Sequence, residues 1–155
     1  MAIVSDPIFV MQRYELKYII TREQENYLRA ALEGHMQVDR FGLTTIASLY
    51  YDTPDRRLIR ASLEAPQFKE KMRLRSYGLA TDSSPVFLEL KRKFDGIVYK
   101  RRAQTTVPLA EWFLHGGADI CDGQICHEMT AFRDRYGNLE PACLILYDRT
   151  AFFEP

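Results

Sequence analysis

The sequence predicts an α+β domain built on an antiparallel β-sheet that curls toward a barrel and carries flanking helices. About six segments have the alternating or β-branched character of strands, and two to four others have helical periodicity. The strongest hairpin signal, Asp95-Gly96, joins two of these strand-like segments as direct neighbours. No regular alternation of strand and helix appears, which argues against a parallel sheet.

The N-terminal part predicts a strand, a helix and a second strand. Arg13–Ile20 alternates in the manner of a strand. Thr21 and Gln24 have the spacing of a capping box, so a helix should begin there and end at Gly34. Thr44–Tyr51 is rich in residues that favour strands.

The remaining elements follow from periodicity and from the turn residues between them. A polar break at 52–55 ends the second strand, and the turn at 82–85 contains a proline. The expected helices are 55–64, 108–114 and about 122–135, and the expected strands are 69–77, 86–94, 97–107 and 142–150.

The composition indicates one domain with a core of its own. The chain has 155 residues, of which 46% are hydrophobic and 12% aromatic, so it is not disordered. No run of about 18 apolar residues could cross a membrane, and the N-terminus lacks the pattern of a signal peptide. Cys121, Cys126 and Cys143 form an odd and sparse set, which fits a reducing compartment and predicts a cytoplasmic protein. We expect these cysteines to be ordinary helix, loop and core residues rather than metal ligands or disulfide partners.

The net charge is zero but unevenly distributed. Between Lys69 and Arg102, ten Lys and Arg residues stand against four Asp and Glu residues, so the rest of the chain is acidic by the same excess. One concentrated basic region in a neutral protein points to a localised anionic ligand, not to general attraction for nucleic acid or lipid.

Side chains alternate along a strand, so residue parity assigns each one to a face. The odd positions of 69–75 carry four cations, whereas Met72 and Leu74 lie on the other face. The same division into a charged side and an apolar side recurs in 86–94 and in 13–18. A charged side that faces water is the ordinary interpretation for a single strand.

The hairpin register weakens that interpretation. With a two-residue Asp95-Gly96 loop, Lys91 lies opposite Lys100 and Glu89 lies opposite Arg102. Like charges directly across a strand pair destabilise it, so an anion held between the cations would explain the arrangement.

At these residues the sequence resembles a known family. The segments RYELKY, SLYYDTPD, KMRLRSYG, FLELKRK, VYKRR and YDRTAF are similar, in order and spacing, to those of the VTC (vacuolar transporter chaperone) domain. This polyphosphate polymerase module belongs to the CYTH, or triphosphate tunnel metalloenzyme, superfamily. The resemblance implies an antiparallel β-barrel tunnel whose Lys, Arg and Glu side chains hold triphosphate or polyphosphate, with ATP as phosphoryl donor and Mn²⁺ or Mg²⁺ assisting.

Carried over by motif, the resemblance implies a set of catalytic and phosphate-binding cations. Glu15 and Glu89 are the candidate metal ligands, while Lys17, Arg73 and Arg75 would also contact the nucleotide together with Arg60. The implied cations are Lys17, Arg73, Arg75, Lys91, Lys100 and Arg149.

Two departures from the family pattern bear on activity. Triphosphatase members begin with Glu-x-Glu-x-Lys, whereas Arg13-x-Glu15-x-Lys17 stands here, which suits a polymerase-like or binding tunnel. The chain, taken as one domain over 1–155, corresponds to about the first two-thirds of the family's domain. We therefore expect an incomplete or open barrel, without the later metal-binding Glu, and an open sheet edge that could form a homo-oligomer.

Two other functions remain as alternatives. A non-catalytic polyanion-binding module would use the same tunnel without turnover. A nucleic-acid-binding barrel of the OB type would use the basic strands together with Phe87 and Tyr99. The zero net charge and the lack of aromatic residues among the basic positions argue against nucleic acid as the preferred partner.

Overall fold

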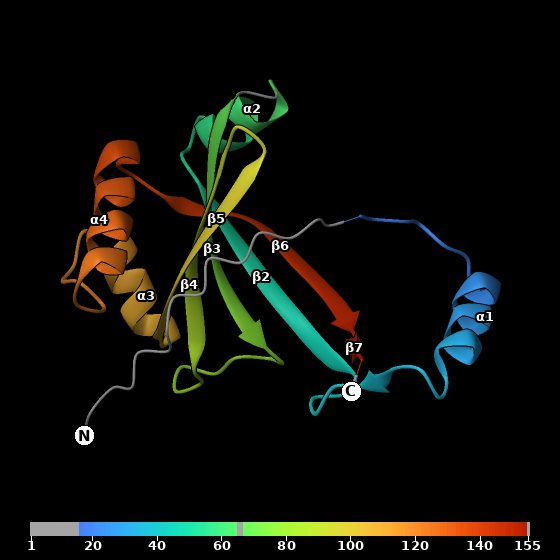
Figure 1. Ribbon diagram of the computed structural model, residues 1–155. Coiled ribbons are helices and arrows are strands. Elements are labelled where there is room, and N and C mark those ends of the chain that lie inside the picture. The colour runs from blue at the N-terminus through green and yellow to red at the C-terminus, as the bar shows by residue number, and fades with distance from the viewer. Residues whose placement is uncertain (1–15, 65–66, 155) are drawn as a thin grey trace. The chain divides into compact units, whose positions relative to one another are not determined.

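The structure, a computed structural model, describes residues 16–64 and 67–154 and divides into two units after Met36 (Figure 1). In the N-terminal unit, helix α1 spans Arg22–Leu32. The predicted capping box is confirmed: the Gln24 amide donates to Thr21 Oγ1 at 3.2 Å, and the Thr21 amide donates to Gln24 Oε1 at 2.8 Å.

The strand predicted for Arg13–Ile20 is wrong over residues 16–20, which lead into α1 without strand structure. A strand requires a hydrogen-bonded neighbour, and none of the described strands pairs with this segment. Residues 13–15, and with them Glu15, lie outside the described part of the chain.

The second unit is built on a five-stranded antiparallel sheet, so the predicted α+β class with an open antiparallel sheet is confirmed. The edge strand β6 (Glu140–Arg149) has exposed side chains from Pro141 onward. In spatial order the strands are β5 (Ile97–Thr105), β4 (Val86–Phe94), β3 (Phe68–Tyr77), β2 (Thr44–Asp52) and β6 (Glu140–Arg149). A short pair that the sequence did not predict, β1 (Gln37–Val38) with β7 (Phe152–Phe153), forms separately.

The Asp95-Gly96 turn sets the register of β4 against β5. Both residues have positive φ, 46° and 82°, as a type I′ turn requires. Phe94 consequently pairs with Ile97, and the predicted opposition of Lys91 to Lys100 is confirmed.

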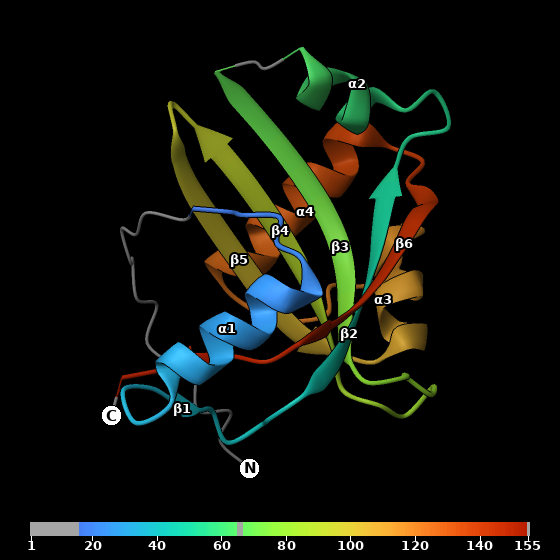
Figure 2. The ribbon, with the colours of Figure 1, turned by 90° about the vertical axis from the view of Figure 1, so that its right-hand side faces the viewer.

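Three helices complete this unit: α2 (Arg57–Leu63), α3 (Val107–Leu114) and α4 (Gln124–Tyr136). Helices α3 and α4 lie on one face of the sheet (Figure 2). The core lies between these helices and the sheet and is apolar. Its fully buried members include Met72, Leu88, Leu90, Ala110, Phe113, Met129 and Phe132.

Asp52 fixes the start of α2. Its buried carboxylate accepts hydrogen bonds from the backbone amides of Leu58 at 2.9 Å and Ile59 at 3.0 Å. These amides have no partners inside the helix, so the carboxylate substitutes for a capping residue. Asp52 therefore lies in the polar break that the sequence indicated at 52–55 and also stabilises the start of α2, which the sequence did not predict.

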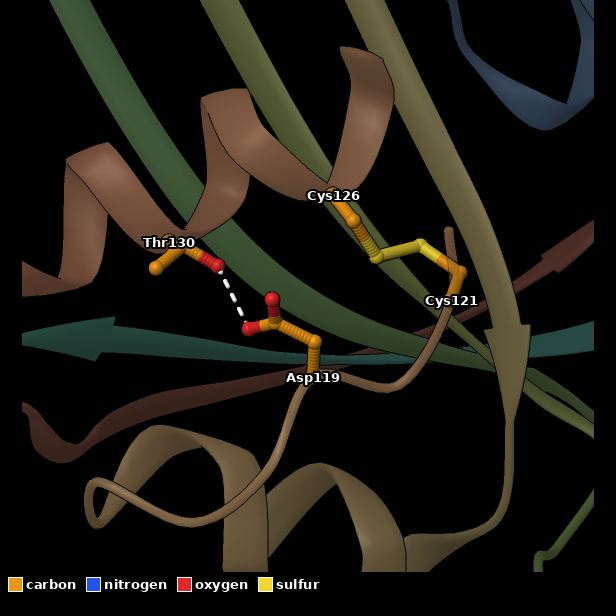
Figure 3. The surroundings of a disulfide bond; sticks show 4 residues. All are labelled: Asp119, Cys121, Cys126 and Thr130. Carbon is orange, nitrogen blue, oxygen red and sulfur yellow. Dashed lines mark hydrogen bonds between the residues drawn. A yellow bond between two sulfur atoms is a disulfide. The ribbon is translucent and has the colours of Figure 1, made fainter. Parts of the chain in front are cut away.

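The loop before α4 is tied to that helix along one side. Cys121 and Cys126 form a disulfide, and Thr130 Oγ1 donates to Asp119 at 2.7 Å (Figure 3). Further along, Arg133 donates to the carbonyl of Gly117 at 3.0 Å. The expectation that Cys121 and Cys126 are unpaired helix and loop residues is wrong, because the turn into α4 brings their Cα atoms within 5.6 Å.

Within the described residues, no helix has the length and apolar character needed to cross a membrane.

The Cys121–Cys126 disulfide should stabilise the second unit by restricting the unfolded chain. We expect Cys121→Ser to lower the free energy of unfolding by about 2 kcal/mol, the loop-closure value for so short a ring. Urea denaturation under oxidising conditions measures this difference. Cys143→Ser, an exposed thiol on β6, is the control and should change little. Equal stability of Cys121→Ser and the unsubstituted protein would contradict the stabilising role.

Candidate functional site

The face of the sheet opposite α3 and α4 gathers the charged side chains that parity assigned to it. We call this surface the basic face. Cross-strand pairing arranges it in rows, because directly opposed residues share a face. Its charged members on β3, β4 and β5 are Lys69, Lys71, Arg73, Arg75, Glu89, Lys91, Lys93, Lys100 and Arg102.

Glu89 is the centre of the first row. Its side chain is 1% exposed and lies between Arg73 on β3 and Arg102 on β5. Arg73 Nε donates to Glu89 Oε2 at 2.8 Å, and Arg102 Nε donates to Oε1 at 2.8 Å. Lys100 Nζ reaches Oε1 at 2.9 Å, and Arg75 Nε lies 3.8 Å from Oε2. One carboxylate therefore faces four cations.

Neighbouring polar and aromatic groups hold the guanidinium groups in place. Arg73 donates to the Tyr50 hydroxyl at 2.9 Å, and Arg102 donates to the Tyr77 hydroxyl at 3.0 Å. The Arg102 guanidinium also stacks over the Phe87 ring, 4.5 Å from its centroid. Arg73 is therefore committed to protein partners on both sides, which fixes its orientation.

The pKa values reflect this excess of positive charge. Burial alone raises the pKa of Glu89, but hydrogen bonds and charges from Lys100, Arg102 and Arg73 outweigh burial and lower it to about 2. Burial lowers the pKa of Lys100, and Arg102 and Arg75 lower it further, although Glu89 acts in the opposite direction. Glu89 thus stays ionised, while Lys100 lies in a site that disfavours its charge.

The next row contains lysines alone. Lys71, Lys91 and Lys100 lie side by side on β3, β4 and β5. Lys100 reaches Glu89, whereas no carboxylate of residues 16–64 and 67–154 lies within ion-pair distance of Lys71 or Lys91. Since opposed like charges destabilise a sheet, a bound anion would stabilise this row.

A cavity of about 400 Å³ adjoins the rows on the side of β2 and β6. Tyr50 and Lys71 from the basic face contribute to its lining, together with Arg56, Ile59 and Ile145. Arg56 has φ 62°, a left-handed conformation that is uncommon for residues other than glycine. Lys71, Asp52 and Arg56, which pairs with Glu140 at 3.4 Å, therefore line this cavity together with apolar side chains.

The structure brings together Arg73, Arg75, Lys91 and Lys100 among the cations implied by the resemblance. Arg149 has the expected parity but pairs with Thr44, six residues along β6 from Cys143. Since Cys143 lies in the row of Tyr50 and Arg73, the backbone of Arg149 is about 20 Å from that row. The structure therefore does not bring Arg149 to Glu89.

Arg60 and Lys17, the other two cations implied by the resemblance, belong to α2 and to the N-terminal unit respectively. Arg60 is exposed on α2, and no described residue pairs with its side chain. Lys17 is exposed in the N-terminal unit, which is described by itself.

The candidate metal ligands do not form a metal site in the described residues. Both oxygens of Glu89 accept hydrogen bonds from cations, so a metal ion bound there would compete with Arg73 and Arg102 for this carboxylate. No group of three or more His, Cys, Asp or Glu residues in the described ranges could hold a metal ion. The second candidate, Glu15, lies outside those ranges.

Tyr50 was not identified from the sequence as part of the site. Tyr51 is buried in the core, whereas Tyr50 lies on the basic face and accepts a hydrogen bond from Arg73. The alternation of the strand carried this signal, because Tyr50 has the parity of Ser48, which pairs with Arg75.

Comparisons with known proteins identify a family and a shared fold. The family model of the VTC domain matches residues 12–155. No curated protein matches the chain. Two matching solved structures are each described as a "putative adenylate cyclase". The Bacillus halodurans protein has 15% identity and a TM-score of 0.52, over 88% of this chain and 71% of its own. The Vibrio parahaemolyticus protein has 13% identity and a TM-score of 0.44, over 86% of this chain and 59% of its own.

The lowered pKa of Glu89 predicts a specific pH dependence. A depressed carboxyl pKa stabilises the fold above the ordinary value of 4.5, and this contribution is lost as the pH falls toward about 2. We expect Glu89→Gln to lower the free energy of unfolding by on the order of 3 kcal/mol at pH 7, with the deficit shrinking between pH 4.5 and 2. Denaturant unfolding across this pH range measures it. A deficit that stays constant with pH would contradict the assignment.

Proposed function

The chain belongs to the VTC domain family, and from this membership and the geometry of the basic face we propose that it binds triphosphate and polyphosphate there. In the finer form of the proposal, the bound chain receives the γ-phosphoryl group of ATP. The lysine row carries the proposal, because Lys71 and Lys91 lie side by side without a carboxylate partner in the described residues.

A linear polyanion suits this surface better than an isolated small anion. The first row places Arg73 and Arg102 on either side of Glu89, and the lysine row continues on the same face of the same three strands. Successive rows are about 7 Å apart, because two residues of a strand separate them. A ligand with repeated charges can neutralise both rows at once.

The proposed chemistry requires little from the protein beyond positioning and charge. A terminal oxygen of the polyphosphate chain attacks the γ-phosphorus of ATP, the bond to the β–γ bridging oxygen breaks, and ADP leaves with that oxygen. Such transition states are loose, so fixed positive charge along the oxygens supplies most of the stabilisation. No general base is needed, since the attacking oxygen is already anionic.

In this proposal the cations that pair with Glu89 have a different role from those that do not. It holds Arg73 and Arg102 in fixed orientations, so part of the positive charge is preorganised before ligand arrives. Among residues 16–64 and 67–154, Lys71 and Lys91 have no carboxylate to leave when phosphate binds. We therefore assign phosphate neutralisation mainly to the lysines. Arg75, whose Nε donates to the Ser48 hydroxyl, would contribute a guanidinium group.

Lys17, Arg60 and Arg149 remain candidates for contacts with other parts of a bound nucleotide or chain. We propose that Mn²⁺ or Mg²⁺ enters with the phosphates of ATP, which are common ligands of these ions. The described carboxylates do not fit a separate metal site, so no step is routed through one.

A non-catalytic polyanion-binding module is the second candidate. The engagement of both Glu89 oxygens by cations favours it, because a metal-assisted transfer would ordinarily use carboxylate ligands. Binding and turnover therefore need separate tests.

Tripolyphosphate should raise the melting temperature much more than sulfate of equal total charge. Lys91→Ala should weaken tripolyphosphate binding by roughly fivefold to tenfold, the value of one partly screened charge pair. The same substitution removes an unfavourable lysine–lysine opposition, so the ligand-free protein should melt at the same or a slightly higher temperature. Thermal melts with and without ligand measure both effects.

Arg135→Ala is the control, because this side chain is 55% exposed on α4, which lies on the face of the sheet opposite the basic face. It should leave the tripolyphosphate shift unchanged. An equal response to sulfate and tripolyphosphate, or a large loss of ligand-free stability in Lys91→Ala, would overturn the binding proposal.

Turnover is tested by incubating the chain with ATP and Mn²⁺ and following ADP and acid-stable polyphosphate together. A polymerase produces the two in proportion, and Lys91→Ala should slow both. ADP without polyphosphate would indicate hydrolysis. Binding of tripolyphosphate without either product would favour the non-catalytic module.

A further inference from the structure

A third row of the basic face extends the cation track past the lysine row. Lys69 on β3 lies directly opposite Lys93 on β4, and Val98 on β5 completes the row. Among the described residues, no carboxylate lies within ion-pair distance of Lys69 or Lys93. Two opposed lysines therefore follow the three lysines of the preceding row.

The other face of the same strand ends shows the opposite arrangement. Glu70 lies directly opposite Arg92, and Arg92 Nε donates to Glu70 Oε1 at 2.6 Å. Arg92 also donates to Glu128 of α4 at 2.6 Å, and Arg101 donates to the same carboxylate at 3.1 Å. The side that packs on α4 thus matches its charges within this stretch of strand.

The contrast argues against ordinary surface charge on the basic face. Alternating signs across neighbouring strands would stabilise the sheet, as the Glu70–Arg92 pair does. On the basic face, five lysines occupy two neighbouring rows, and Glu89, at the centre of the preceding row, reaches one of them. Such a cluster costs stability in the empty protein and is offset when a polyanion binds.

The position of the third row selects for ligand length. It lies four residues along β3 from the row of Arg73 and Glu89, which corresponds to about 13 Å. Three phosphorus atoms linked by two bridging oxygens are too short to contact both ends of this track. A longer linear chain can contact the Glu89 row, the lysine row and the third row together.

We propose that Lys69 and Lys93 form an extension subsite that makes the basic face prefer inorganic polyphosphate chains longer than triphosphate. The inference rests on the proposed function, since it assigns a length preference to the same surface. Lys69 and Lys93 are specificity-determining residues in this account and need not contact the reacting phosphorus. Val98, the third member of their row, offers no aromatic surface for a base, which favours polyphosphate over single-stranded nucleic acid.

The test compares tripolyphosphate with a defined longer polyphosphate chain by isothermal titration calorimetry at fixed ionic strength. The unsubstituted protein should bind the longer chain more tightly. The double variant Lys69→Ala/Lys93→Ala should keep its tripolyphosphate affinity and lose roughly tenfold in affinity for the longer chain, the screened value for two cations. Arg135→Ala, on α4 at the opposite face of the sheet, is the control and should alter neither affinity.

Each outcome decides a different point. If the unsubstituted protein binds neither ligand, the proposed function fails and the extension fails with it. If tripolyphosphate binds but the longer chain gains nothing, or if the double variant loses affinity for both ligands equally, the extension is overturned and the proposed function stands. An oligonucleotide of matched charge that binds as tightly as the longer chain, and weakens equally in the double variant, overturns selection for polyphosphate. The melting temperature of the ligand-free double variant should not fall, which separates loss of binding from loss of folding.

Discussion

The arrangement of the basic face depends on one buried carboxylate. Glu89 is 1% exposed and faces Arg73, Arg102, Lys100 and, at longer range, Arg75. A buried ionised carboxylate without cations would be costly, and buried cations without a carboxylate would repel each other. Glu89 therefore allows guanidinium groups to be held at fixed positions on an open sheet, while the excess of positive charge remains available to a ligand.

The two faces of the sheet treat charge differently for a physical reason. On the side of α3 and α4, apolar residues form the core, and ionic groups such as Glu70, Arg92 and Glu128 pair with each other where the helix meets the sheet. On the basic face, lysine rows lie open without matched carboxylates in the described residues. The paired charges thus hold α4 against the sheet. The unmatched lysines mark the surface on which a bound anion would be stabilised most.

The sequence predicted the local features of this site well. Strand parity placed Arg73, Glu89 and Lys91 on one side, and the Asp95-Gly96 turn predicted the Lys91–Lys100 opposition, because both depend on neighbouring residues. The sequence could not show that β6 pairs with β2 in a register that places Arg149 opposite Thr44, about 20 Å along the strand from the row of Arg73, because this register depends on pairing between segments distant in the sequence. The strand expected at 16–20 and the unpaired state expected for Cys121 and Cys126 were wrong for a similar reason. Pairing with a neighbouring strand, and the path of a turn into a helix, are set by the folded chain.

The central claim is that the lysine row receives phosphate while Glu89 keeps its arginines. A crystal structure of the chain with tripolyphosphate tests this most directly. The account predicts phosphate oxygens within hydrogen-bond distance of Lys71, Lys91 and Lys100, with Arg73 and Arg102 still paired to Glu89. Tripolyphosphate bound elsewhere with the basic face empty, or a bound state in which Arg73 and Arg102 leave Glu89, would contradict it.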